Sequence, residues 1–246
     1  MKKQRIDKLL VEHGLAESQI KARALVMAGV VLVNETRVDK PSESFVENAV
    51  IRIKGESTES RYASRGGLKL EAALRAFAID PSGFVCLDVG SSTGGFTDCL
   101  LQHGAKKVFA IDAGTNQLVW ALRTDPRVEV YERTNARNLT PDDFDTQFDL
   151  AVIDVSFISV TKILSAIFSL LKPTGKLVVL IKPQFEVGRG EVGTGGIVRE
   201  SEKHERVVAE VNAFAKSLGL NVGGLIESPI LGAEGNKEFL VLYATR

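Results

Sequence analysis

The stretch LDVGSSTGGFTD, residues 87–98, indicates a nucleotide-binding α/β fold and distinguishes between the ligands that such a fold can hold. It ends a strand-like apolar run and leads through a glycine-rich turn into a helical pattern, the order found at the ligand-binding turn of Rossmann-like domains. A dinucleotide-binding turn needs a second glycine two residues after the first, because the backbone approaches a pyrophosphate there. Ser92 stands at that position after Gly90, and the carboxylate of Asp88 would repel phosphates but suit a cation. The pattern therefore favours S-adenosylmethionine, a cationic ligand without phosphates, over NAD.

From residue 84 onward the chain alternates apolar strand-like runs with helical patterns. The runs KVFAID, FDLAVIDV and KLVVLIKP are rich in Val, Ile and Leu, which predicts a parallel sheet with helices on both faces. The last two runs, LNVGGLIESPI and KEFLVLYATR, have no helix between them, so they predict a hairpin and an antiparallel last strand. The expected fold class is α/β, a Rossmann-like domain with a mostly parallel sheet.

Residues 1–58 are expected to form a separate, small α+β unit. The spacing in RIDKLLVEHGL predicts a helix, Ser18 suits the N-cap of a second helix that Gly29 ends, and short strands follow. The polar residues 59–64 are the expected linker to an α/β domain of residues 65–246. The first unit resembles the S4 RNA-binding module, which implies RNA contacts by the basic residues Lys3, Arg5, Lys8, Lys21 and Arg23.

Composition argues against several classes of protein. The 31 basic and 31 acidic residues balance, so any basic surface is local and a purely electrostatic RNA binder is disfavoured. No apolar run approaches the roughly 20 residues that span a bilayer, and no signal-peptide core is present, so we expect a cytoplasmic protein without membrane contact. The two cysteines and three histidines show no metal-ligand spacing, and no metal site is expected.

The glycine-rich turn resembles the FtsJ-like ribose methyltransferases, which read D-x-G-x-x-x-G-G-[WF]-[ST]. The matching positions are Asp88, Gly90, Gly94, Gly95, Phe96 and Thr97. The whole chain, including the S4-like unit, resembles the TlyA family, whose members bear the old name hemolysin. The resemblance implies methylation of a ribose 2'-hydroxyl, on cytidine, in ribosomal RNA within ribosomal subunits. It also implies a catalytic set of Lys69, Asp154, Lys182 and Glu238.

Two residues of this catalytic set are supported without the resemblance. Asp154 and Lys182 follow apolar strands, and the carboxyl ends of parallel strands face the ligand-binding crevice of such sheets. Lys69 and Glu238 lie in sequence contexts typical of surface residues, so their assignment to the catalytic set rests on the resemblance alone. Two roles stay open for Lys182, a base that takes the proton of the hydroxyl or a charged donor that orients it.

The remaining expectations concern binding. Asp112 ends the second strand, where it would meet ribose hydroxyls, and Asn135 and its neighbours would contact adenine. The expected cofactor contacts are Asp88, Gly90, Ser91, Ser92, Gly94, Gly95, Phe96, Asp112, Asn135 and Ala136. Arg65 and Arg189 are further candidates for RNA contacts.

The segment 183–200 has five glycines and no hydrophobic period. It is either a mobile flap whose Arg189 and Arg199 meet phosphate, or simply a loose loop.

Two rival functions belong to other classes. One is a ribosome-assembly factor that binds RNA without methylating it. The other is a membrane-active hemolysin, which would need an amphipathic or apolar membrane segment that the sequence does not show.

Overall fold

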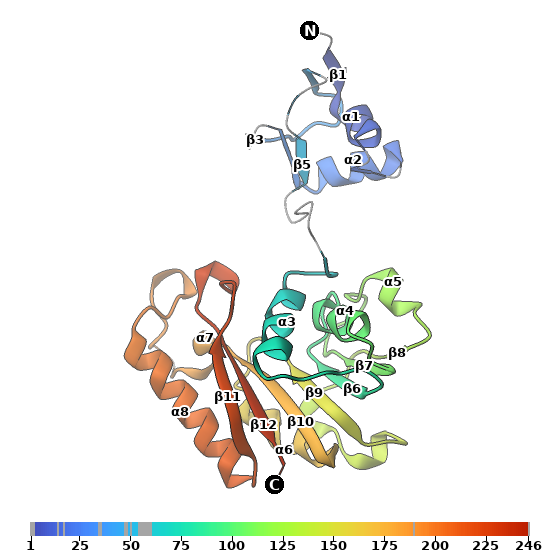
Figure 1. Ribbon diagram of the computed structural model, residues 1–246. Helices are drawn as coiled ribbons and strands as arrows, with labels where there is room; N and C mark the ends of the chain where they lie inside the picture. Colours follow the sequence, from blue (N-terminus) through green and yellow to red (C-terminus); the bar gives the residue numbers. More distant parts are fainter. Residues whose placement is uncertain are drawn as a thin grey trace. The chain divides into compact units, whose positions relative to one another are not determined.

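The computed structural model describes residues 3–13, 15–16, 18–33, 36–46, 49, 51–53, 61–188 and 190–245. The chain divides into two compact units, Met1–Arg61 and Tyr62–Arg246 (Figure 1). The expected linker, residues 59–64, extends into the second unit, which begins at Tyr62. Tyr62 is only 3% exposed and belongs to the core of the second unit, where a Cβ on Gly67 would lie 2.3 Å from it. Residues 62–64 are therefore part of the α/β unit.

The first unit is a small α+β fold with two helices and short strands, as predicted. Its elements are β1 (Lys3–Arg5), α1 (Ile6–Glu12), α2 (Gln19–Met27), β2 (Val31–Val33), β3 (Thr36–Arg37), β4 (Ser44–Val46) and β5 (Ile51–Ile53). The side chain of Ser18 accepts the N–H of Lys21 and caps α2, and Gly29 follows the helix with a φ of +70°. Ile6, Leu10, Ala22 and Val26 of the helices pack on β2 to form this unit's own core.

The second unit contains one seven-stranded sheet. Its strands are β6 (Val85–Val89), β7 (Lys107–Ile111), β8 (Val128–Tyr131), β9 (Phe148–Ile153), β10 (Leu171–Ile181), β11 (Asn221–Glu227) and β12 (Phe239–Ala244). The order across the sheet is β11-β12-β10-β9-β6-β7-β8. The strands from β10 to β8 are parallel, and β12 is antiparallel to both of its neighbours, β10 and β11. The predicted antiparallel last strand is confirmed.

Helices cover both faces of this sheet, because alternate side chains of each buried strand point to opposite sides. The helices are α3 (Gly66–Ala76), α4 (Gly95–Gln102), α5 (Trp120–Arg123), α6 (Thr161–Ser169), α7 (Pro183–Glu186) and α8 (Ser201–Ser217). Short 3-10 turns lie at Ala136–Asn138, Pro141–Asp143, Thr194–Gly196 and Ala233–Gly235. On one face α3 and α4 pack on residues such as Cys86, and on the other face α6 and α8 pack on residues such as Leu87 (Figure 1). In the part of the chain that is described, no helix is long and apolar enough to cross a membrane.

The strand register brings distant residues together at one end of the sheet. Val89 of β6 lies beside Ile153 of β9 and Ile111 of β7, so the residues that follow these strands are neighbours. Because β12 runs opposite to β10, Ile181 pairs with Phe239, which places the end of β10 beside the start of β12. The carboxyl ends of β6, β7, β9 and β10 thereby meet the start of β12 at a single crevice.

Candidate active site

The glycine-rich turn between β6 and α4 is shaped by close backbone approach. Gly90 has a φ of +86°, and a Cβ there would lie 2.3 Å from the main-chain oxygen of Asp154. Only glycine lets the ends of β6 and β9 come so close in this conformation. The N–H groups of Gly90 and Ser91 both donate to the main-chain oxygen of Ile111, at 2.8 and 3.1 Å. The turn is thus held against the ends of both neighbouring strands.

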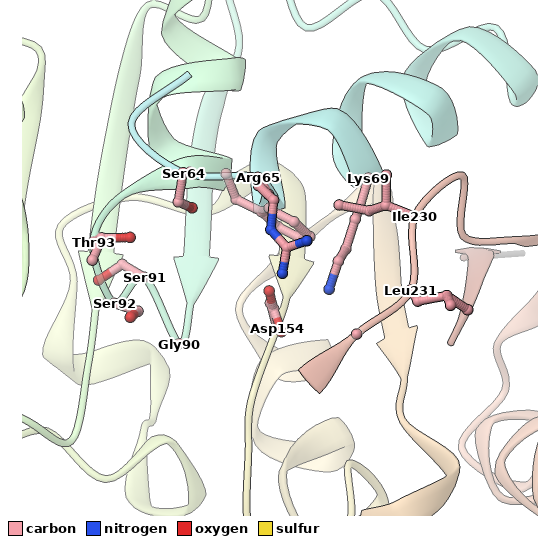
Figure 2. A pocket seen from close by; sticks show the side chains of 14 residues that line it. Ser64, Arg65, Lys69, Gly90, Ser91, Ser92, Thr93, Asp154, Ile230 and Leu231 are labelled. Atoms are coloured by element: carbon pink, nitrogen blue, oxygen red, sulfur yellow. The ribbon is translucent and has the colours of Figure 1, made fainter. Parts of the chain in front are cut away.

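A polar cavity of about 250 Å³ opens beside this turn, where α3 and α4 begin (Figure 2). It is lined by Ser64, Arg65, Gly66, Lys69, Gly90, Ser91, Ser92, Thr93, Gly95, Phe96, Asp154, Ile230, Leu231 and Gly232. Figure 2 shows the ends of the Arg65 and Lys69 side chains directed toward the Asp154 carboxylate. Hydroxyl groups and charges of both signs face this space, so it suits a ligand that itself carries charges.

A larger cavity of about 450 Å³ adjoins the polar cavity and has mainly apolar walls. It is lined by Val89, Gly90, Ser92, Ile111, Asp112, Ala113, Gln117, Thr134, Asn135, Ala136, Arg137, Asp154, Val155, Ser156, Phe157, Ile158 and Ile163. The two cavities share Gly90, Ser92 and Asp154, so they are parts of one crevice. The carboxylate of Asp112 accepts the N–H groups of Ser92 and Gly114, at 2.8 and 2.7 Å, which fixes it at the wall.

Two ion pairs at this crevice join four distant segments. Lys182 Nζ lies 2.6 Å from Asp154 Oδ1 and donates a hydrogen bond of 3.0 Å to Ser156 Oγ. Lys69 Nζ donates to Glu238 Oε2 at 2.5 Å, and the Glu238 side chain is only 2% exposed. Lys69 and Asp154 line the polar cavity, and Lys182 and Glu238 pair with them there. The structure therefore brings all four expected catalytic residues together.

The Asp154 carboxylate is held by a cation at the crevice. Its Oδ1 atom lies 2.6 Å from Lys182 Nζ, the distance of a charge-assisted hydrogen bond. A carboxylate has two oxygens with about four lone-pair sites, so Asp154 can accept further hydrogen bonds. Asp154 lies in both cavities, so a ligand in either one could donate to it.

Two family models match this chain. Residues 62–245 match the FtsJ-like methyltransferase family, and residues 4–51 match the S4 domain. The chain belongs to the FtsJ-like methyltransferase family. It is an enzyme of that family, and its N-terminal unit is an S4 domain.

Close relatives within the family extend over nearly the whole chain. The chain is 50% identical to "Putative rRNA methyltransferase YqxC" of Bacillus subtilis over 241 residues, 98% of this chain and 85% of the relative. It is 43% identical to the 16S/23S rRNA (cytidine-2'-O)-methyltransferase TlyA of Mycobacterium tuberculosis over 242 residues, 98% of this chain and 90% of the relative. A solved structure, "Putative hemolysin from Streptococcus thermophilus", has a TM-score of 0.76 at 48% identity and covers 100% of this chain and 89% of that one. The resemblance to the TlyA family is confirmed.

Not all of the residues expected to contact the cofactor line the crevice. Eight of the ten expected residues line a cavity, but Asp88 and Gly94 do not. Asp88 is fully buried, and its Oδ2 atom accepts a hydrogen bond of 2.6 Å from Thr97 Oγ1 of α4. Because side chains alternate along β6, that of Asp88 enters the layer between the sheet and α4 and does not line the crevice. Gly94 has a φ of +102°, and its missing Cβ makes room for Leu122.

The buried Asp88 carboxyl predicts a pH dependence of stability. Burial raises the pKa of Asp88 from 3.8 to about 7, against the lowering effect of the hydrogen bond from Thr97. The folded protein then holds a proton that the unfolded chain releases, so this contribution to stability is full below pH 4 and is lost as the pH rises toward 7. Relative to Asp88→Asn, the wild type should lose about 2–3 kcal/mol of unfolding free energy between pH 5 and pH 7.5. Urea unfolding of both proteins across this range measures the difference, and parallel pH profiles would contradict it.

The sequence analysis missed several residues of the crevice. Phe157 is 91% exposed, has a φ of +65°, and its ring lies 5.1 Å from that of Phe185. In the sequence, the only sign of this residue is an aromatic side chain in the run VSFIS that follows Asp154. Ser64 was assigned to the linker, yet it lines the polar cavity, and a Cβ on Gly95 would lie 2.2 Å from its hydroxyl. Residues 230–232 reach the cavity from the far end of the chain, and their sequence carries no motif.

The basic residues expected to contact RNA fall into three groups. In the S4 domain Lys3, Lys8 and Lys21 are exposed. Arg5 and Arg23, also exposed, both donate to the fully buried Asp7 carboxylate, at 2.9–3.0 Å. This arginine pair lowers the pKa of Asp7 to about 2. Arg65 lines the polar cavity, and Arg189 lies outside the described residues.

Proposed function

We propose that this protein transfers a methyl group from S-adenosylmethionine to a ribose 2'-hydroxyl in ribosomal RNA, with cytidine as the nucleotide. The observation that carries the proposal is the Lys182–Asp154 and Lys69–Glu238 pairing at a crevice made of two adjoining cavities. Both relatives cited above are named as ribosomal RNA methyltransferases, and the one from Mycobacterium tuberculosis as acting on the cytidine 2'-oxygen.

The residues of the crevice fit S-adenosylmethionine. The larger cavity offers apolar walls for an adenine and the fixed Asp112 carboxylate as an acceptor for ribose hydroxyls. The polar cavity offers Arg65 and the hydroxyls of Ser64 and Ser91 to the charged amino-acid end. The Asp154 carboxylate, paired with Lys182, lies where the two cavities meet and can accept a further hydrogen bond. When bound, the cofactor supplies an electrophilic methyl group on a positively charged sulfur.

The chain's own residues must handle the proton of the ribose hydroxyl. An alcohol is a weak nucleophile until its proton is drawn away, and a positioned base contributes about 10²–10⁴-fold. Lys182 is held by Asp154 and Ser156, two acceptors from the turn after β9. That arrangement supports the role of an oriented cation that donates to the hydroxyl oxygen and stabilises its developing negative charge. The Asp154 carboxylate, which lines both cavities, accepts the proton that the hydroxyl gives up. Lys69, fixed by Glu238, adds a second positive charge at the cavity.

The exposed Phe157 ring supplies a surface for the target base. It lies at the wall of the larger cavity and packs against Phe185, whose ring is 6.0 Å from Lys182 Nζ. A ring that is 91% exposed contributes little to the core, and its left-handed backbone conformation is unusual for an aromatic residue. Enzymes that modify nucleotides commonly stack an unpaired base on an aromatic side chain.

Phe157→Ala should therefore weaken RNA use without weakening the fold. Loss of one stacking partner is worth about 1–3 kcal/mol, so the KM for ribosomal subunits should rise by about 5- to 150-fold. The melting temperature should stay within a degree or two of the wild type. Trp120→Ala is a matched control, because Trp120 is 75% exposed but lines neither cavity. Equal KM values for the two variants would remove Phe157 from RNA binding.

The S4 domain suits the role of holding structured RNA for this site. Its fixed arginine pair, Arg5 and Arg23, and the exposed Lys3, Lys8 and Lys21 are groups that contact phosphates.

Ribose methylation mapped along ribosomal RNA, from cells with and without this protein, tests the proposed function. We expect at least one cytidine 2'-O-methyl group to depend on the protein. Identical maps would contradict the proposal.

A further inference from the structure

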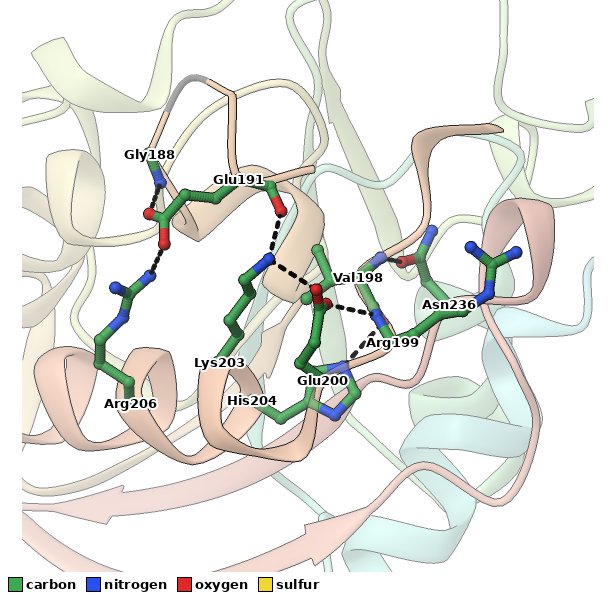
Figure 3. A network of polar contacts seen from close by, with 9 residues as sticks. All are labelled: Gly188, Glu191, Val198, Arg199, Glu200, Lys203, His204, Arg206 and Asn236. Atoms are coloured by element: carbon green, nitrogen blue, oxygen red, sulfur yellow. Dashed lines mark hydrogen bonds and ion pairs between the residues drawn. The ribbon is translucent and has the colours of Figure 1, made fainter. Parts of the chain in front are cut away.

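Residues 193–200, the part of the glycine-rich segment that directly precedes α8, are held in place by a network of polar contacts (Figure 3). Asn236, 2% exposed, accepts the N–H of Val198 at 3.0 Å and donates to the main-chain oxygen of Gly196 at 2.9 Å. His204, 5% exposed, hydrogen-bonds the main-chain oxygen of Val198 at 2.8 Å, so its Nε2 atom carries the hydrogen. Both main-chain groups of Val198 are thus fixed by buried side chains, which is not the arrangement of a loose loop.

The same network continues to the wall of the polar cavity. The main-chain oxygen of Asn236 accepts the N–H of Gly232 at 2.8 Å. Gly232 lines the polar cavity, and a Cβ there would lie 1.9 Å from Glu238 Oε1. Asn236 therefore connects the glycine-rich segment to the loop that packs on the Lys69–Glu238 pair.

Arg199 differs from the other basic residues of this network. Lys203 donates to Glu200 Oε1 and to the main-chain oxygen of Glu191, and Arg206 pairs with Glu191 at 2.7 Å. The exposed side chain of Arg199 has no ion pair among the residues that the structure describes, and Figure 3 shows its guanidinium pointing away from Glu191 and Glu200. A main chain that Asn236 ties to the wall of the polar cavity thus presents a cation without an ion pair among the described residues.

We propose that Arg199 is a fixed contact for an RNA phosphate next to the target nucleotide, positioned by Asn236 and His204 through Val198. The inference rests on the proposed function, because it takes the ligand at the crevice to be RNA. A guanidinium on a main chain that is already ordered loses little freedom when it meets a phosphate, and its planar donors match phosphate oxygens. Arg199 thereby fixes the position of the RNA strand at the crevice, while Lys182, Asp154, Lys69 and Glu238 act on the ribose.

The test compares Arg199→Gln with Arg206→Gln, a matched loss of charge in which the removed cation was already paired with a carboxylate. The probe is purified ribosomal subunits from cells that lack this protein. Methyl transfer and binding are measured with the full-length chain at several salt concentrations. For Arg199→Gln we expect the KM for subunits to rise about fivefold with kcat nearly unchanged. The slope of log affinity against log salt should become shallower by about one, and Arg199→Lys should restore that slope.

The positioning role is tested by a double-mutant cycle. In an Asn236→Ala background, Arg199→Gln should raise the KM by clearly less than fivefold, because the arginine is no longer held. If Asn236→Ala does not fold, His204→Gln takes its place. A KM and a salt slope for Arg199→Gln equal to those of Arg206→Gln would overturn the phosphate contact, and a full fivefold effect in both backgrounds would overturn the positioning. If the wild type itself transfers no methyl group to subunits, the proposed function fails instead.

Discussion

Lys182→Ala should lower kcat for methyl transfer by about 10²–10³-fold, the effect of losing a donor to a developing oxyanion, while the affinity for S-adenosylmethionine stays within a few-fold of the wild type. Lys182 contacts Asp154 and Ser156, which follow β9, and its ammonium is the group proposed to donate to the ribose hydroxyl. Its loss removes the group that orients the hydroxyl but leaves the walls of both cavities in place. Single-turnover transfer of a labelled methyl group and calorimetric titration of the cofactor measure the two effects separately.

Lys172→Ala is the matched control for that variant. Lys172 also pairs with an aspartate at 2.6 Å, Asp149 at the start of β9, at the opposite end of the strand from the crevice. Its loss removes the same charge and the same kind of ion pair from the same domain. We expect normal turnover. Turnover by Lys182→Ala equal to that of Lys172→Ala would exclude Lys182 from the reaction.

Glu238→Ala should lower the free energy of unfolding by about 3–5 kcal/mol, because it leaves the Lys69 ammonium buried without its partner. Lys69 Nζ is 2.5 Å from Glu238 Oε2, and the two side chains are only 10% and 2% exposed. For a domain of this size the melting temperature should fall by about 6–20 °C. Urea and thermal unfolding at one pH measure the change.

Replacing both partners of this pair separates stability from activity. The double variant Lys69→Met, Glu238→Leu has no buried charge at the pair, so most of the lost stability should return, while methyl transfer should not. Glu227→Ala is the control, because the Lys237–Glu227 pair is half exposed and should be worth no more than about 1 kcal/mol. Full activity in the double variant would show that the pair serves only the fold.

The parts of the fold that the sequence predicted are those with a local signal. Apolar runs located the strands, and the missing helix before the last run predicted the antiparallel β12. Asp154 was predicted from its place after a buried strand, because every parallel strand of such a sheet delivers its following residue to the same edge. The membership of Lys69 and Glu238 in the expected catalytic set came only from the family resemblance. Their ion pair, between residues 169 positions apart, has no local signal and was not predicted.

The errors also have physical causes. Asp88 was expected to meet the cofactor because it precedes the glycine turn, but strand alternation points its side chain to Thr97 in α4. Residues 62–64 look like a linker because they end the polar stretch ESTESRYAS, yet Tyr62 fills the space that Gly67 leaves open. Phe157 could not be recognised as a site residue, because an exposed aromatic side chain and a buried one look alike in sequence.

The most direct test of the central claim is the chemical identity of the product. Ribosomal subunits from cells that lack this protein are incubated with the purified chain and S-adenosylmethionine that carries a deuterated methyl group. The RNA is then digested to nucleosides and analysed by mass spectrometry. We expect deuterated 2'-O-methylcytidine, with the label on the ribose, from the wild type, and at least about 100-fold less from Lys182→Ala at equal, short reaction times. Label on a base, or no label with either protein, would contradict the account.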